Sequence, residues 1–231
     1  MVPHPPRAAL ELFGSQLPQA QVYAELLAGP GVERGLIGPT ETERLWDRHL
    51  LNSAVVAELI PAVSGQESVQ LADLGSGAGL PGIVLAILLP QVSVTLVEPM
   101  ARRTAFLQEC IAMLGLSNAQ VRRGRAEEFV GEIGADVVTS RAVARLDRLA
   151  GLAAGLARPG GLVLAIKGAA AGQELAQAQS VLRRLGATGI GIVTAGAGLV
   201  DQPATVVRFR TGRNASLSPS AGYGGRPKRR T

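Results

Sequence analysis

The stretch QLADLGSGAGLPGIVLAILLP, from Gln70 to Pro90, contains two cofactor-binding patterns that overlap. One is G-x-G-x-x-G, which is typical of enzymes that bind NAD or FAD, and its glycines are Gly77, Gly79 and Gly82. The other begins with an acid and is typical of chains that bind S-adenosylmethionine; its members are Asp73, Gly75, Gly77 and Gly79. Which cofactor the chain binds therefore depends on which set of glycines forms the turn.

Apolar strands alternate with helical segments on both sides of this stretch. Strands are predicted at Val69–Leu74, Val92–Val97, Ala119–Arg122, Asp136–Thr139 and Gly161–Ile166. Helices are predicted between them, near Pro81–Leu89, Met100–Leu114, Leu146–Ala157 and Gln173–Leu185. This alternation predicts an α/β fold with a doubly wound, mostly parallel sheet. Two further strands, Gly189–Ala195 and Ala204–Phe209, follow without a helix between them and are expected to form an antiparallel edge.

A helical segment is predicted before the sheet. The sequences RAALELFG and PQAQVYAELLAG indicate two short helices, the second ending at Gly29-Pro30. Thr40 followed by Glu43 resembles a capping box, which would open a third helix that stops at Pro61. We therefore expect an N-terminal helical extension over residues 1–64, a cofactor-binding domain over 65–210 and a disordered basic tail over 211–231.

The basic residues gather at the end of the chain. From Arg208 onward there are seven Arg and Lys residues and no acids, so residues 1–207 carry 16 basic and 18 acidic residues, a net charge of −2. A basic tail favours polyanions such as RNA, through contacts to phosphates. The same tail could equally serve only to keep the chain soluble.

Several classes of protein are disfavoured by what the sequence lacks. The apolar run Leu80–Leu89 is too short to cross a bilayer, and the N-terminus has no apolar segment of a signal peptide. Cys110 is the only cysteine, which excludes an internal disulfide and a multi-thiolate metal site. We expect a cytoplasmic monomer without a metal site.

Two acids favour the S-adenosylmethionine pattern. Asp73 lies at the end of the first predicted strand, where its carboxylate would repel a diphosphate but suit a sulfonium and an ammonium. There it would organise the glycine turn or reach the cofactor through water. Glu98 ends the next strand, where an acid accepts hydrogen bonds from ribose hydroxyls in either kind of site.

Five motifs in order make the chain similar to a known family. They are LWDRHLLNSAVV, DLGSGAGLPG, GRAEEF, SRAVA and AIKG. The likeness as a whole runs from about residue 20 to residue 209. The chain resembles the bacterial 16S ribosomal RNA guanine-N7 methyltransferase G family, also called glucose-inhibited division protein B. The resemblance implies a class I methyltransferase fold, S-adenosylmethionine as methyl donor and a guanosine in the decoding region of the small subunit as acceptor.

The resemblance also implies roles for single residues on the cofactor side. Gly75, Gly77 and Leu80 match the contacts to the methionine part of the cofactor, and Glu98 matches the acid that binds the ribose. That acid is often aspartate in the family, so Glu98 must reach one methylene further. Ala126 and Glu127 match the segment that lies along the adenine.

On the acceptor side, Arg141 in SRAVA matches a position near both donor and acceptor. Arg48, His49 and Lys167 resemble positions implicated in engaging RNA. Each has a plainer interpretation: a surface ion pair for Arg141, a packing or capping role for His49 and a solvated side chain for Lys167.

The sequence is compatible with methyl transfer to guanine N7. Carbon-5 methylation of pyrimidines uses a cysteine nucleophile, but Cys110 falls within a predicted helix. Amine methylation usually goes with a proline-aromatic loop after the fourth strand, and here that loop reads TSRAVA. Guanine N7 carries a free lone pair and needs no general base. Two alternatives remain open: an NAD-dependent oxidoreductase that uses Gly77, Gly79 and Gly82, and a non-catalytic RNA-binding module.

Overall fold

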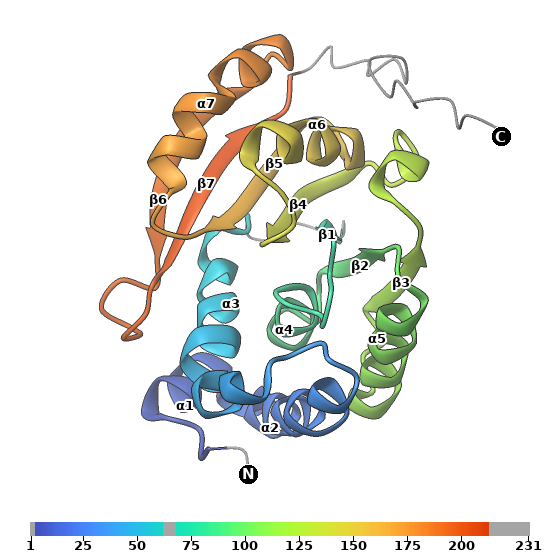
Figure 1. The fold of residues 1–231 in the computed structure, drawn as a ribbon, viewed down its shortest axis with the longest axis vertical. Helices are drawn as coiled ribbons and strands as arrows, with labels where there is room; N and C mark the ends of the chain where they lie inside the picture. The colour runs from blue at the N-terminus through green and yellow to red at the C-terminus, as the bar shows by residue number, and fades with distance from the viewer. Residues whose placement is uncertain (1–2, 62–67, 213–231) are drawn as a thin grey trace, which may run out of the picture.

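A seven-stranded sheet runs through the computed structural model, which describes residues 3–61 and 68–212 (Figure 1). The strand order is β3-β2-β1-β4-β5-β7-β6. The strands are β1 (Gln70–Leu74), β2 (Ser93–Glu98), β3 (Ala119–Arg123), β4 (Ala135–Arg141), β5 (Ala157–Lys167), β6 (Thr188–Ala195) and β7 (Ala204–Arg210). All seven predicted strands are present.

The first five strands are parallel, and β7 runs antiparallel to both of its neighbours. The expected antiparallel edge is therefore confirmed. β1 lies between β2 and β4, so the strand order reverses direction beside the end of β1. In an open parallel sheet, ligands bind at such a point, beyond the carboxyl ends of the strands.

Helices cover both faces of the sheet (Figure 1). One face packs against the N-terminal helices, α4 (Gly82–Leu88) and α5 (Ala101–Leu114), and the other against α6 (Leu146–Leu156), α7 (Ala171–Arg184) and the short 3₁₀ helix η6 (Ala126–Phe129). Neighbouring residues of β1 divide between the two apolar clusters: Leu71 belongs to the first and Ala72 to the second. Burial on both faces explains why the strands read as apolar runs.

The second N-terminal helix continues past the point where the sequence predicted its end. After α1 (Arg7–Phe13) and a 3₁₀ turn, η1 (Gly14–Gln16), helix α2 (Leu17–Leu26) leads directly into the π turn η2 (Leu27–Gly31), which contains Pro30. The prediction of a stop at Gly29-Pro30 was wrong, because the wider π turn admits a residue without an N–H. The chain leaves the helix only near Gly35, which has a φ of 63°.

The third predicted helix is a series of tighter and wider turns. It comprises η3 (Pro39–Arg44), η4 (Leu45–Leu51), α3 (Asn52–Ala54) and η5 (Val55–Leu59). The expected capping box was wrong: Gly38 precedes the helix and makes no side-chain cap, and Pro39 occupies the first position, for which proline is suited. Thr40 therefore lies inside the first turn. The helix ends before Pro61, as predicted.

The N-terminal helices share one apolar core with the sheet. Phe13, Tyr23 and Leu50 are fully buried in the same cluster as Leu71 and Leu96 of the strands. The predicted boundary between residues 64 and 65 lies outside the described residues. Of the tail predicted over 211–231, the structure describes only Thr211, which is buried, and Gly212. No helix in the described part of the chain has the length and apolar character required to cross a membrane.

Candidate active site

The glycine turn follows β1 and bends back over the end of β2. Gly75, Gly77 and Gly79 have φ values of 69°, 58° and 98°, a region that residues with a Cβ rarely adopt. The N–H groups of Gly75 and Ser76 both donate to the carbonyl oxygen of Val97, at 2.9 and 3.1 Å. The turn thus uses the glycines of the pattern that starts at Asp73.

Asp73 supports this turn from below. One carboxylate oxygen accepts a hydrogen bond from the N–H of Gly82 at 3.1 Å, and the other accepts one from the Thr139 hydroxyl at 3.1 Å. Complete burial raises the pKa of Asp73 from 3.8 to about 6, although its hydrogen bonds act in the opposite direction. A Cβ at Gly82 would lie 2.7 Å from this carboxylate, so only glycine fits there.

The start of α4 offers no site for a diphosphate. A dinucleotide would place its diphosphate at the helix N-terminus, against free N–H groups. Here Pro81 has no N–H, the N–H of Gly82 is bound by the Asp73 carboxylate, and the N–H of Ile83 donates to Gly79. A buried carboxylate at this point repels a diphosphate. The geometry disfavours the NAD alternative.

Glu98 fixes the next part of the site. Its side chain is 1% exposed, and its two carboxylate oxygens accept hydrogen bonds from the N–H groups of Gly77 and Met100, each at 3.0 Å. Arg103 approaches the same carboxylate at 3.7 Å. Since a carboxylate accepts more than one hydrogen bond at each oxygen, Glu98 keeps acceptor capacity for two hydroxyl groups.

A cavity of about 330 Å³ lies against the glycine turn and Glu98. Five of the predicted cofactor-binding residues line it: Gly75, Gly77, Leu80, Glu98 and Arg141. Apolar side chains complete it, among them Leu36, Ile37, Met100 and Val143.

Three other predicted cofactor-binding residues lie outside this lining. Asp73 is buried beneath the turn. Ala126 and Glu127 belong to η6, which follows β3 at the sheet edge where the N–H of Gly124 donates to the carbonyl of Glu98. η6 therefore lies beyond the Glu98 end of the cavity.

A second cavity, of about 600 Å³, lies next to the first. All four predicted RNA-binding residues line it: Arg48, His49, Arg141 and Lys167. Residues 141–143 line both cavities and form the wall between them, which we call the shared wall. Within it, Ala142 is the one residue other than glycine in the described chain that has a positive φ, 55°.

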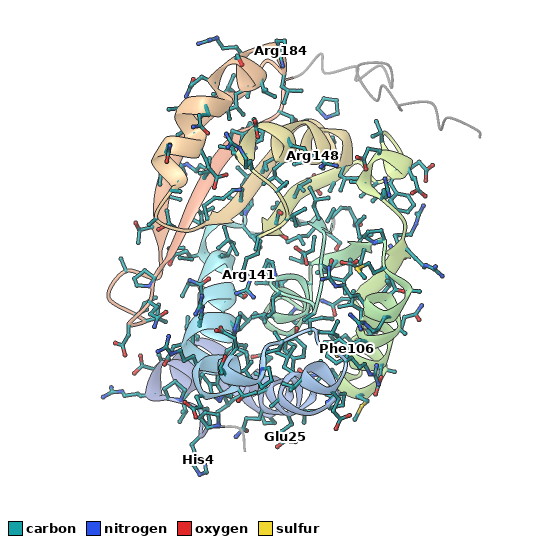
Figure 2. The ribbon with its side chains drawn as sticks, viewed as in Figure 1. His4, Glu25, Phe106, Arg141, Arg148 and Arg184 are labelled. Carbon is teal, nitrogen blue, oxygen red and sulfur yellow. The ribbon has the colours of Figure 1, made fainter. Side chains whose placement is uncertain are left out.

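Arg141 lies at the end of β4, near the centre of the view in Figure 2. Its guanidinium donates to the carbonyl oxygen of Arg48 at 3.2 Å and to Nδ1 of His49 at 3.0 Å. Burial lowers the pKa of Arg141, and the negative charge of Asp73 opposes this effect. Arg141 is not the surface ion pair of the plainer interpretation.

Lys167 is not solvated either. Its ammonium donates to the carbonyl oxygen of Ala144 at 2.6 Å and to Glu174 at 2.8 Å, and its side chain is only 7% exposed. Glu174 also accepts the N–H of Leu146 at 2.9 Å, and the contacts with Lys167 and Leu146 lower its pKa despite partial burial. Lys167 and Glu174 thus hold the connection between β4 and α6.

Three residues that shape the site were not predicted from local sequence patterns. The hydroxyl of Tyr23, from α2, donates to the carbonyl of Ala78 in the glycine turn at 2.7 Å. Glu41 contacts His49 and Arg48. Val143 packs over Gly75, where a Cβ would lie 2.5 Å from it. The contacts of Tyr23 and Val143 join segments far apart in the chain, and the contact of Glu41 with His49 gains its meaning from Arg141, 92 residues from His49.

Comparison with known proteins agrees with this geometry. Residues 16–198 match the family model of rRNA small subunit methyltransferase G (GidB). Relatives named ribosomal RNA small subunit methyltransferase G include those of Thermobifida fusca, 53% identical over 97% of this chain and 96% of the relative, and Streptomyces avermitilis, 48% identical over 99% and 97%. The relative from Mycobacterium sp. strain KMS is 51% identical over 98% of both chains.

Solved structures agree in fold. A putative S-adenosylmethionine-dependent methyltransferase from Methanococcus maripaludis has a TM-score of 0.56 at 14% identity, over 87% of this chain and 95% of its own. The P. horikoshii TYW2 protein in complex with MeSAdo has a TM-score of 0.53 at 14% identity, over 72% and 63%. Sheet order, glycine turn and family match point the same way: the chain belongs to the rRNA small subunit methyltransferase G family and is an S-adenosylmethionine-dependent methyltransferase of the class I fold.

Proposed function

We propose that this chain transfers a methyl group from S-adenosylmethionine to N7 of a guanosine in the decoding region of 16S ribosomal RNA, within the small subunit or a precursor of it. The names of the relatives and the family support the class of RNA. The observation that carries the proposal is the pair of cavities that share the wall of residues 141–143. One cavity suits the donor and the other suits a nucleotide.

The residues of the first cavity fit the donor. Its volume of about 330 Å³ falls in the usual range of small-molecule sites, from about 300 to 1,000 Å³. Backbone of Gly75 and Gly77 would hold the methionine part, with Leu80 beside it. Glu98 would accept hydrogen bonds from the ribose hydroxyls, and Ala126 with Glu127 would lie along the adenine. Asp73 would act indirectly, by holding the turn.

When bound, S-adenosylmethionine supplies a methyl group on a positively charged sulfur. The protein's task is to align the acceptor with that methyl across the shared wall, and such positioning can supply roughly 7–11 kcal/mol. Arg141 faces both cavities and offers a planar set of donors that matches guanine O6 or an RNA phosphate. Arg48 adds positive charge to the second cavity, whereas the charge of Lys167 is balanced there by Glu174.

The second cavity has no free base among the residues that the structure describes there, which suits N7 as the acceptor atom. Among the described residues that line it, Glu174 is the only carboxylate, and it is bound to Lys167 and to the N–H of Leu146. Both nitrogens of His49 are also engaged, by Arg141 and Glu41. An amine or hydroxyl acceptor must lose a proton, whereas guanine N7 attacks with a lone pair that is already free.

The direct test uses isotopically labelled S-adenosylmethionine and small ribosomal subunits that lack this modification. The RNA is digested and its nucleosides are read by mass spectrometry. We expect label in 7-methylguanosine. Label in another nucleoside would contradict the proposed acceptor atom. Absence of label, with cofactor binding shown separately, would contradict the proposed substrate.

Arg141→Ala tests the shared wall. We expect kcat to fall by roughly 100-fold, the scale of a misaligned acceptor, while the fold survives because the sheet core is unchanged. Circular dichroism and thermal unfolding serve as the control for folding. Turnover near that of the wild type would remove Arg141 from the site.

A further inference from the structure

Three side chains from three elements form a line of hydrogen bonds behind the shared wall. Glu41 lies on η3, His49 on η4 and Arg141 at the end of β4. Oε2 of Glu41 lies 3.0 Å from Nε2 of His49, and Nδ1 of His49 lies 3.0 Å from a terminal nitrogen of Arg141. Glu41 lines neither cavity, so it acts on them only through its neighbours.

The chemistry of Arg141 fixes the direction of these bonds. A guanidinium has N–H donors and no acceptor, so Nδ1 of His49 must accept. The proton of the neutral imidazole is therefore on Nε2, which donates to the carboxylate of Glu41. This line of bonds exists only while His49 is neutral, and it uses both of the ring's nitrogens.

The line of bonds also fixes the plane of Arg141. One terminal nitrogen donates to the carbonyl of Arg48 and the other to His49. Two anchors on a rigid planar group leave it little freedom to rotate. The other N–H groups of Arg141 have no partner among residues 3–61 and 68–212, and the side chain lines both cavities.

We propose that Glu41 and His49 are positioning residues for methyl transfer, which hold the Arg141 guanidinium in one orientation at the shared wall. In this role the imidazole of His49 bridges two side chains and does not bind RNA through its nitrogens. The proposal rests on the proposed function, since it requires a reaction at the shared wall.

The bridge has a defined dependence on pH. Burial and the charge of Arg141 lower the pKa of His49 below 6.5, Glu41 raises it and Arg48 lowers it. These three are the charged groups that face the ring, from η3, η4 and β4. When the pH falls below this pKa, Nδ1 gains a proton and two donors face each other. Arg141 then loses one anchor, and kcat falls on the acid side.

Nuclear magnetic resonance of the histidine nitrogens tests the bridge without any assay of activity. The chain has only two histidines, and the exposed His4 provides the internal reference. We expect His49 to be a neutral Nε2–H tautomer at pH 7 and to titrate below pH 6.5. An Nδ1–H tautomer or a charged ring at pH 7 would overturn the proposal.

Kinetics of four proteins test the positioning role: the wild type, Glu41→Ala, Glu41→Gln and Glu43→Ala. We expect Glu41→Ala to lower kcat by roughly 10-fold to 100-fold, with the KM for small subunits and the Kd for S-adenosylmethionine changed less than twofold. Glu43 is exposed on the same helix and bonds to no side chain in the described residues, so Glu43→Ala should match the wild type.

Glu41→Gln supplies a readout that a purely structural role would not affect. Its amide oxygen can still accept the Nε2 proton, so most of kcat should return. The lost negative charge no longer raises the pKa of His49, so the acid limb of the kcat profile should move to lower pH. This result can be obtained even if Glu41→Ala fails to fold.

The outcomes separate this proposal from the proposed function. A wild type that transfers no methyl group to RNA contradicts the proposed function, while the tautomer still reports on the bridge. If the wild type is active and Glu41→Ala has an unchanged kcat, the positioning role is overturned. A change confined to the KM for small subunits would also overturn it, by showing that Glu41 serves RNA binding.

Discussion

At the scale of the residue, Asp73 combines complete burial with a partly compensated charge. Its oxygens hold the start of α4 and the Thr139 hydroxyl, and burial raises its pKa to about 6. The folded state thus binds this proton more tightly than the unfolded chain does. The contribution of Asp73 to stability is therefore greatest below about pH 3.8 and is lost as the pH rises through about 6.

Asp73→Asn tests this dependence. The shift from 3.8 to about 6 corresponds to roughly 3 kcal/mol. Between about pH 3 and pH 7 we expect the stability of the wild type to fall by about this amount relative to Asp73→Asn. Urea unfolding across the pH series measures it. Asp201→Asn, which changes an exposed carboxylate, is the control. A flat difference for Asp73→Asn would contradict the burial argument.

Gly75→Ala tests the glycine turn. Gly75 has a φ of 69°, and an added Cβ would lie 2.5 Å from Val143. Gly131 has a φ of 77° but open space around it, so Gly131→Ala shares the backbone strain without the clash. We expect each variant to lose about 1–2 kcal/mol of stability, and only Gly75→Ala to lose affinity for S-adenosylmethionine, by at least roughly tenfold. Calorimetric titration with S-adenosylmethionine measures the affinity of each variant. Equal affinities of Gly75→Ala and Gly131→Ala would contradict the close packing of Val143 over Gly75.

At the scale of the element, the connection between β4 and α6 is held at several points. Val143 packs over Gly75, the carbonyl of Ala144 accepts from Lys167, and the N–H of Leu146 donates to Glu174. The strained Ala142 lies between these contacts. Such strain persists only where surrounding contacts determine the backbone. Lys167 is thus a brace for the shared wall in this structure.

Lys167→Met separates the brace from a phosphate contact. It keeps the apolar stem but leaves Glu174 without its cation, so we expect a loss of about 2–3 kcal/mol. Adding Glu174→Gln should recover about half of this loss, because no unpaired charge remains. A simple phosphate contact instead predicts unchanged stability and a salt dependence of RNA binding weaker by about one unit of slope. Unfolding and binding measured in parallel distinguish the two.

Local patterns predicted the elements well where one physical cause dominated. Burial on both faces made the central strands apolar and bounded, and most strand ends were predicted within one or two residues. β5 is the exception, because it begins at Ala157, four residues before the predicted start at Gly161. The two failures, at Pro30 and at Thr40, came from local rules that assume an α-helix. At Pro30 the chain forms a π turn, and at Pro39 the next helix begins earlier than predicted. In both places the backbone groups that need hydrogen-bond partners differ from those of an ideal α-helix. Single-sequence patterns do not distinguish these helix types.

The site was predictable to the extent that it is local. Glycines and acids at the predicted strand ends indicated the glycine turn and the position of Glu98 in the site, because a parallel sheet brings those ends together. Tyr23 and Glu41 could not be found this way. Tyr23 contacts Ala78 across 55 residues, and Glu41 acts on Arg141 through His49, which is 92 residues from it in the chain. Only the packing of the N-terminal helices creates those contacts.

At the scale of the whole molecule, the N-terminal helices are part of the site. They share the core of one sheet face and reach the glycine turn through Tyr23 and the shared wall through His49. The hydroxyl of Tyr23 is completely buried beside Gly79, and burial raises its pKa. The residues that shape the first cavity therefore come from both the N-terminal helices and the sheet domain.

Tyr23→Phe tests this connection. It leaves the carbonyl of Ala78 without its donor, and we expect a loss of about 1–2 kcal/mol of stability together with a several-fold weaker affinity for S-adenosylmethionine. Thr211→Val removes a comparable hydroxyl, which donates to Arg158 at 2.9 Å far from the cavity, and should cost stability alone. An unchanged affinity of Tyr23→Phe for S-adenosylmethionine would show that the N-terminal helices do not influence the glycine turn through this hydrogen bond.

The shared wall has a thermodynamic consequence. Arg141, Ala142 and Val143 face both cavities, so a molecule that shifts them on one side changes the surface offered on the other. Free energy depends only on the states and not on the order of filling. Whatever factor the donor applies to the affinity for RNA, RNA must therefore apply to the affinity for the donor. Residues 141–143 are therefore the part of the chain through which a shift caused in one cavity would reach the other.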